Sequence, residues 1–172
     1  MKAIALLALA LAAACWDRTA TDQSRSDPGS NARAAAAPAV ALRGWVTDAA
    51  EVIGPQEEAS LSARLAEFER RSGRQMVVVT VPSLHGQDIA PFTTALGNSW
   101  GIGRAEQDDG IILLVAPNER RGRIAVGLGL EQTLPDALCR QILEREIMPR
   151  FRDGRIASGI DAGVAALIRH AS

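Results

Sequence analysis

Two apolar runs separated by one helix-length segment constrain the fold of this chain most strongly. The first run, QMVVVTV, spans Gln75 to Val81, and the second, GIILLVA, spans Gly110 to Ala116. Both runs are rich in branched apolar residues, which is typical of strands buried on both faces of a sheet. Between them, residues 89–100 carry apolar side chains at helical spacing and stop at Gly101. This order predicts a βαβ unit with parallel strands and a right-handed crossover.

The segments on either side of this unit predict further helices and one more strand. Residues 55–72 have Pro55 in the first turn, one apolar face and Gly73 as a left-handed stop. RIAVGLG, from Arg123 to Gly129, follows the second run after a short loop and predicts an antiparallel hairpin. Helical patterns cover residues 133–147, with Thr133 as the cap, and about 155–170. We therefore expect an α/β fold, a three-layer α/β/α sandwich around a mixed sheet of about three to four strands.

The first residues indicate export. MKAIALLALALAAAC has one lysine, an apolar run shorter than the about 20 residues that span a membrane, and small residues before Cys15. The end of this stretch resembles a bacterial lipobox, in which the cysteine accepts a lipid, although Ala12 stands where leucine is usual. A soluble secretory signal is the alternative. Both interpretations predict the periplasmic side of the bacterial cell envelope, and the first adds a membrane anchor through lipid at Cys15.

Composition divides the chain into three parts. Residues 1–14 are the predicted signal peptide, residues 15–42 a lipidated cysteine followed by a flexible tether, and residues 43–172 one folded domain. The chain has 47% hydrophobic and 23% charged residues, which is a globular balance. Its net charge of −1 argues against nucleic acid as a partner, because phosphate-binding surfaces carry a large basic excess.

Asp108 and Asp109 stand side by side at the entry to the second buried strand. Adjacent like charges repel each other, so the pair predicts an offsetting cation or a well-hydrated turn. Chain direction places the pair at the amino edge of the parallel strands, and Glu131 follows the antiparallel strand at the same edge. Clustered carboxylates with loop carbonyls are the ligands of Ca²⁺ and Mg²⁺. A solvated Asp-Asp-Gly turn is the alternative, and local sequence alone favours that turn.

For three other groups of residues, a functional interpretation competes with a simpler structural one. Ser83, His85 and Asp88 lie in one short loop, but we reject a catalytic triad because no nucleophile elbow accompanies them and Asp88 is needed as a helix cap. Cys139 lies in a helical pattern and is interpreted as a small buried hydrophobe. A group of arginines has the chemistry to clamp a phosphate, and a solvated hairpin tip is the favoured interpretation. These arginines are Arg120, Arg121 and Arg123.

Five stretches of this chain stand in a recognisable order and spacing: VTDAAEVI, VVVTVPSLHGQDI, WGIGRAEQDDGIILLVA, RIAVGLGLE and IMPRFRDGRIASGI. Together they resemble the TPM domain family of bacterial envelope, thylakoid and membrane-associated eukaryotic proteins. The resemblance covers residues 46 to about 168 and implies an α/β/α sandwich. Two positions depart from the family pattern: Asp109 stands where asparagine is frequent, and Gln132 stands where glycine follows GLE.

The resemblance also implies a range of functions. Family members are described as divalent-cation binders, as weak acid phosphatases and as auxiliary partners of membrane proteins. By resemblance, cation ligands are expected at Asp108 and Asp109, with Asp48 as a third ligand that has turn capping as its alternative role. Glu131 is the weakest of the four candidates, because a carboxylate near a helix start is stabilised without a metal.

We expect an exported, lipid-anchored TPM-domain protein that binds Ca²⁺ or Mg²⁺ and acts as an accessory or scaffold for membrane proteins. The alternative is a weak metal-dependent phosphatase acting on phosphomonoesters, in which the cation polarises a phosphoryl oxygen or activates water. The sequence shows no committed nucleophile or general base, which favours the accessory role. No catalytic residue is therefore assigned.

Overall fold

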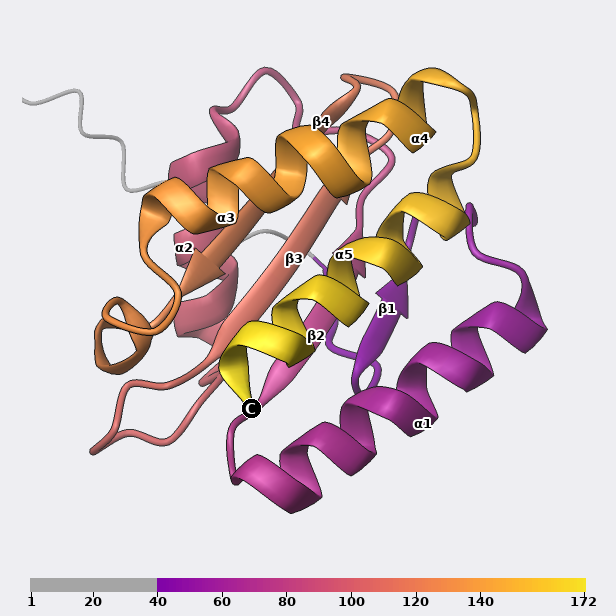
Figure 1. Cartoon of the computed structure of the whole chain (residues 1–172). Helices are drawn as coiled ribbons and strands as arrows, with labels where there is room; N and C mark the ends of the chain where they lie inside the picture. Colours follow the sequence, from indigo (N-terminus) through magenta and orange to yellow (C-terminus); the bar gives the residue numbers. More distant parts are fainter. Residues whose placement is uncertain (1–39) are drawn as a thin grey trace, which may run out of the picture. The chain divides into compact units, whose positions relative to one another are not determined.

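The computed structural model describes residues 40–172, which contain a four-stranded sheet in the order β1-β2-β3-β4 (Figure 1). The strands are β1 (Val46–Asp48), β2 (Met76–Thr80), β3 (Ile111–Ala116) and β4 (Arg121–Val126). The first three strands run parallel, and β4 pairs antiparallel with β3. The predicted mixed sheet, with its βαβ unit and hairpin, is confirmed. The predicted signal peptide, Cys15 and most of the predicted tether lie outside the described residues.

Helices cover both faces of this sheet. One face carries α2 (Ile89–Trp100), and the other carries α1 (Pro55–Ser72), α3 (Asp136–Ile142) and α5 (Ile156–Ala171). A 3-10 turn, η1 (Leu128–Leu130), follows β4, and the segments η2 (Leu143–Ile147) and α4 (Met148–Arg152) connect α3 to α5. Within residues 40–172, every helix is too short or too polar to cross a membrane. The layers are those of the expected α/β/α sandwich.

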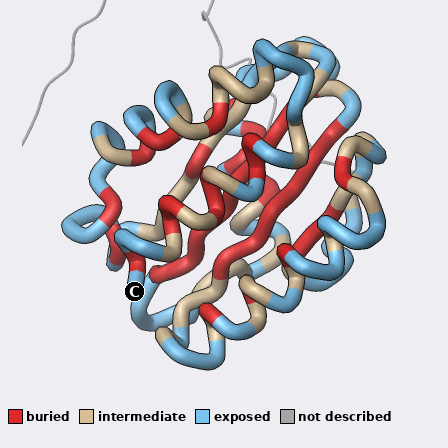
Figure 2. The backbone as a smooth tube through the Cα atoms, turned by 45° about the vertical axis from the view of Figure 1, so that its right-hand side comes forward, coloured by how far each residue is buried: buried red, intermediate tan, exposed pale blue. Residues whose placement is uncertain are grey.

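The side chains of the central strands alternate between two separate cores. In β2, Met76 and Val78 pack on the side of α1 and α5, whereas Val77 and Val79 pack on the side of α2. None of these four side chains is more than 1% exposed. Figure 2 shows the central strands in red along their length. Strands buried on both faces need a helical layer on each side, which is why the fold has three layers.

The connections β1–α1–β2 and β2–α2–β3 cross opposite faces of the sheet. The strand order advances in the same direction at both steps, while α1 belongs to one core and α2 to the other. The two crossovers therefore have opposite hands, although parallel units favour the right-handed one. The first unit was not predicted, because β1 has three residues and shows no strand periodicity.

The segment after β4 departs from the single helix expected over residues 133–147. The predicted start at Thr133 is wrong: Pro135 occupies the N-cap position, and Asp136 is the first helical residue. The helix continues as a π-helical segment, η2, over Leu143–Ile147, where the N–H of Met148 donates to the Leu143 carbonyl five residues back. Pro149 has no N–H with which to continue the regular ladder, so the hydrogen-bond pattern changes just before it.

Glycine allows α5 to pack closely against η2. A Cβ atom at Gly163 would lie 2.5 Å from Ile147 Cδ1 and 2.7 Å from Ile147 Cγ1. Carbon atoms in favourable contact are about 3.5–4.0 Å apart, so a side chain at this position must displace its neighbour. Gly163 therefore fixes the spacing between the last helix and the π-helical segment.

We predict that Gly163→Val lowers the free energy of unfolding by about 1–3 kcal/mol, because the added branches overpack against Ile147. Chemical denaturation followed by circular dichroism measures the loss. Ser158→Val, at an exposed position of the same helix, is the control and should cost less than about 1 kcal/mol. Equal losses in the two variants would contradict the close-packing argument.

Candidate functional site

Asp109 has a cationic partner within the chain. Its carboxylate accepts hydrogen bonds from the Arg104 backbone N–H at 3.0 Å and from Arg104 Nε at 2.9 Å, and it also binds Arg104 Nη2. Asp109 is only 3% exposed, whereas half of the Arg104 side chain faces solvent. The guanidinium therefore supplies a positive charge at the place where the sequence predicted a cation or a hydrated turn.

This pairing lowers the pKa of Asp109. The hydrogen bond from the Arg104 side chain favours the charged carboxylate and outweighs burial, which acts in the opposite direction on the pKa. The same hydrogen bond raises the pKa of Arg104. Asp109 is thus an ionised, internally paired carboxylate at neutral pH.

Asp108 lies on the solvent side of the same loop. It has a φ of +44°, and its Oδ2 accepts a hydrogen bond from the Leu128 N–H at 3.1 Å. The Asp108 carbonyl accepts a second bond, from the Gly129 N–H at 2.9 Å. A Cβ atom at Gly127 or Gly129 would collide with the backbone of this loop. The loop and the segment after β4 therefore meet at the amino edge of the sheet, as chain direction predicted.

Asp48 lies at the opposite edge of the sheet. It ends β1, next to Thr80 at the end of β2, so it belongs to the carboxyl edge of the parallel strands. Its Oδ2 accepts a hydrogen bond from the Ile53 N–H at 2.8 Å, and its Oδ1 accepts one from the Thr80 hydroxyl. These contacts are those of the turn-capping role that the sequence left open.

The structure therefore does not gather the four predicted ligands. Asp108 and Asp109 are adjacent, Glu131 is exposed just after η1 at the same edge, and Asp48 is at the other edge. Within residues 40–172, no three His, Cys, Asp or Glu side chains come together in a group that could hold a metal ion. A cation at Asp108, with its free oxygen and nearby loop carbonyls, stays a prediction.

The carboxyl edge is closed by contacts between two loops. Glu119, in the β3–β4 turn, accepts hydrogen bonds from Ser83 Oγ at 2.9 Å and from the Leu84 N–H at 2.8 Å. The bond from the Leu84 backbone is the main reason that the pKa of Glu119 is below its usual range. His85 donates its backbone N–H, at 3.0 Å, to Ser83 Oγ. Ser83 thus ties the β2–α2 loop to the hairpin, and this geometry agrees with the rejection of a triad.

The contacts of Asp88 and the burial of Cys139 both indicate structural roles. Asp88 occupies the N-cap position of α2 but makes no side-chain cap bond, and its carboxylate instead lies 3.4 Å from Arg121 Nη2. Cys139 is 3% exposed, and burial raises the pKa of its thiol to about 11. The thiol is therefore protonated at neutral pH, as expected for a small buried hydrophobe.

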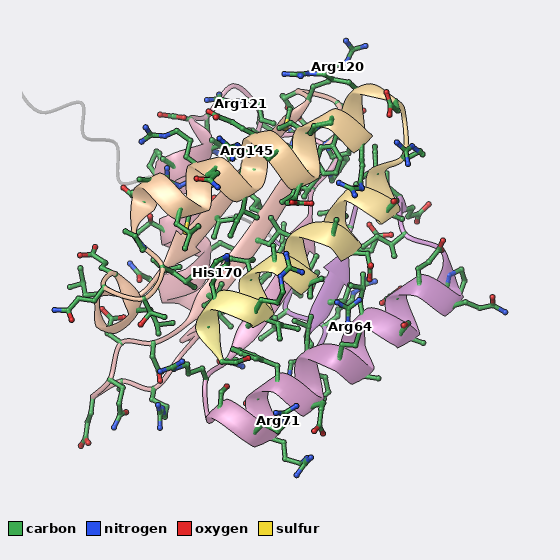
Figure 3. All side chains as sticks on the ribbon, in the orientation of Figure 1. Arg64, Arg71, Arg120, Arg121, Arg145 and His170 are labelled. Carbon is green, nitrogen blue, oxygen red and sulfur yellow. The ribbon has the colours of Figure 1, made fainter. Side chains whose placement is uncertain are left out.

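A groove of about 590 Å³ lies between α1 and α5 on the outside of their layer. Phe68 and Ile168 give it an apolar lining, and Figure 3 shows Arg64 and Arg71 along α1. The sequence pattern did not predict this groove, because its width depends on how two helices from opposite ends of the domain pack together. The residues that line it are Ala63, Arg64, Glu67, Phe68, Arg71, Ser72, Ala165, Ile168, Arg169 and Ser172.

The fold and the sequence together define the class of protein. The α/β/α sandwich with a β3–β4 hairpin is the arrangement that the TPM resemblance implied, and the model of the TPM domain matches residues 46–170. The chain belongs to the TPM domain family. A search of curated protein sequences finds no match.

Solved bacterial domains have the same fold. The N-terminal domain of a protein from P. gingivalis is 31% identical, with a TM-score of 0.69 over 74% of this chain and 81% of that chain. The N-terminal domain of the cg2496 protein from Corynebacterium glutamicum is 18% identical, with a TM-score of 0.60 over 77% and 82% of the two chains. The BA42 protein from the psychrophilic Bizionia argentinensis is 14% identical, with a TM-score of 0.60 over 70% and 81%. The last two show the fold alone.

We predict that Asp109→Asn lowers the free energy of unfolding at neutral pH by about 1–3 kcal/mol, because the buried oxygen loses its charged hydrogen bonds. The folded-state pKa of Asp109 is depressed, so its contribution is present above the ordinary value near 3.8 and is lost as the pH falls through the folded-state value. Denaturant unfolding between pH 7 and about pH 2 should therefore show an acid-dependent loss in the wild type that is smaller in the variant.

Glu106→Gln is the matched control for this experiment. Glu106 is an exposed carboxylate in the same loop, so its substitution should change stability by less than about 0.5 kcal/mol at either end of the pH range. If Asp109→Asn and the wild type lose stability in parallel below the ordinary pKa of aspartate, the stabilising role of the Arg104 pair is contradicted.

Proposed function

We propose that this TPM-domain protein is an exported accessory protein of the bacterial cell envelope that binds a helical segment of a membrane protein. The groove between α1 and α5 carries the proposal. Its lining combines Phe68 and Ile168 with the small side chains of Ala63 and Ala165, which leave room for an inserted side chain. An amphipathic helix binds such a groove by placing its apolar face on the lining.

Charge at the groove supports a partner with acidic side chains. Arg64 and Arg71 on α1 and Arg169 on α5 line it, and Glu67 is the one acidic side chain among the described residues that line it. Arg64 is already paired with Asp161 across the two helices, and Glu67 with Arg70. Arg71 and Arg169 form no ion pair within residues 40–172, so they are the groups that would meet acidic side chains of the partner.

The surroundings of the described nucleophiles support binding rather than hydrolysis. Ser83 donates its hydroxyl to Glu119, and the Cys139 thiol is buried with a raised pKa. Neither group has a histidine side chain as a hydrogen-bonded base within residues 40–172. Hydrolysis of a phosphomonoester by the purified protein, retained at neutral pH and lost in Asp108→Asn, would instead favour the phosphatase alternative.

The groove is tested by site-specific photocrosslinking in the bacterium. A photoreactive residue at Ile168 should crosslink to a membrane protein, and Ala165→Glu should abolish that adduct because it places a charge on the apolar lining. A photoreactive residue at Thr94, exposed on α2 on the other face of the sheet, is the control. The same adducts from both positions, or an adduct from Ile168 that survives Ala165→Glu, would contradict a specific groove.

The anchor in this proposal is a lipid on Cys15, supported by the lipobox-like sequence. Cys15→Ser should move the protein from the membrane fraction to the soluble periplasmic fraction, because the lipid-accepting thiol is gone. Cys139→Ala removes the buried thiol and should leave the protein with the membrane. Membrane retention of the Cys15→Ser protein would contradict the anchor but leave the groove to its own test.

A divalent cation is the third part of the proposal, at Asp108 with Glu131 at the same edge. Ca²⁺ or Mg²⁺ at about ten times its Kd should stabilise the native state by about 1.4 kcal/mol, a rise in Tm of about 2–8 °C. Asp108→Asn should remove this rise, whereas Glu106→Gln in the same loop should keep it. An equal rise in Tm in the two variants would contradict a cation site at Asp108. No rise in the Tm of the wild type at millimolar Ca²⁺ or Mg²⁺ would contradict it as well.

A further inference from the structure

A second cavity, of about 320 Å³, lies beside β4 at the carboxyl edge of the parallel strands. We call it the arginine pocket, because four arginines line it: Arg120, Arg121, Arg123 and Arg140. The first three come from the β3–β4 turn and β4 and the fourth from α3, and Figure 3 shows Arg120 and Arg121 at that end of the molecule. The three arginines that the sequence placed at a solvated hairpin tip therefore share this pocket with a fourth arginine, Arg140 of α3.

The charges of the arginine pocket are poorly matched within the described chain. Asp136 is the one carboxylate of the described residues that lines it, and Asp88 pairs with Arg121 at 3.4 Å. Arg123 and Arg140 form no ion pair within residues 40–172. The chain as a whole has a net charge of −1, so this positive cluster is a local feature.

Arg123 distinguishes the arginine pocket from a solvated surface. The residue is only partly buried, but its Nε atom is shielded from solvent and has no hydrogen-bond acceptor among residues 40–172. A buried N–H without an acceptor destabilises the native state, so such groups are rare. Arg123 itself lines the pocket, and a guanidinium offers parallel N–H groups that match phosphate geometry.

The position of the pocket in the fold also favours an anion. The carboxyl ends of parallel strands are the edge at which open α/β sheets bind ligands. Ile89, the first residue of the 12-residue helix α2, lines the pocket, and the N-terminal end of a helix carries a partial positive charge. Leu143, which begins the π-helical segment η2, also lines the pocket. Such π-helical turns are frequent at functional sites.

We propose that the arginine pocket binds a phosphate group, with Arg123 and Arg140 as its principal donors. The proposal does not rest on the groove between α1 and α5, on Cys15 or on a cation at Asp108. It assigns binding and no hydrolysis, since no nucleophile is involved. A free phosphorylated molecule and a phospholipid headgroup present the same chemistry, and the experiment below separates them.

The test uses the full chain with two probes, inorganic phosphate in calorimetry and sedimentation with vesicles of phosphatidylglycerol or phosphatidylcholine. Phosphate binding with a millimolar or lower Kd indicates a free phosphorylated ligand. Retention on phosphatidylglycerol vesicles without phosphate binding indicates a headgroup. In either case Arg140→Gln should weaken binding at least tenfold, whereas Arg70→Gln, an exposed surface arginine on α1, should leave it unchanged.

Arg123→Met separates a ligand-binding arginine from a merely structural one. If Arg123 is held for a ligand, this variant should lose phosphate or vesicle binding at least tenfold while its Tm without ligand stays equal or rises. A fall in Tm with unchanged binding would overturn the assignment of Arg123. Absence of binding to both probes, or equal weakening by Arg140→Gln and Arg70→Gln, would overturn the proposal, and neither result would bear on the groove crosslinks.

Discussion

Burial of both faces of β2 and β3 is the constraint on which the other features of this domain depend. Two strands that are apolar at nearly every position need a helical layer on each side, which α2 supplies on one face and α1, α3 and α5 on the other. The buried polar contacts of the two candidate regions beside the sheet therefore lie at its edges. The amino edge holds the Asp109–Arg104 pair, and the carboxyl edge holds the Glu119 contacts and the arginine pocket.

The elements that could be predicted are those whose pattern is local and repeated. The expected strand over residues 75–81 is observed as Met76–Thr80, and the expected helix over residues 89–100 as Ile89–Trp100. The strand β1 could not be predicted, because three residues show no period and its pairing with β2 depends on the intervening helix. The helix over residues 133–147 was only partly right, since apolar spacing continues through the π-helical turn that precedes Pro149.

The candidate site was predicted less well than the fold, for a physical reason. The repulsion between Asp108 and Asp109 suggested an offsetting positive charge or water, but sequence spacing did not identify Arg104 as a partner of Asp109. The loop between α2 and β3 folds back on itself, which a linear pattern does not record. Asp48 was placed with the pair by resemblance, whereas the direction of β1 carries it to the other edge. Arg123 and Arg140 line the same pocket only because α3 packs beside β4.

The two cores differ in how much of the chain they require. Among the described residues, every buried member of the core under α2 lies between Val77 and Ala116, whereas the other core extends from Val46 to Ala171. Contacts close in sequence form with less loss of chain entropy, so the α2 side can assemble before the rest. During synthesis, α1 precedes β2 and β3, but the part of their opposite face that α3 and α5 cover stays uncovered until those helices have left the ribosome. During that interval the uncovered part is an apolar surface that a chaperone can hold before the domain closes.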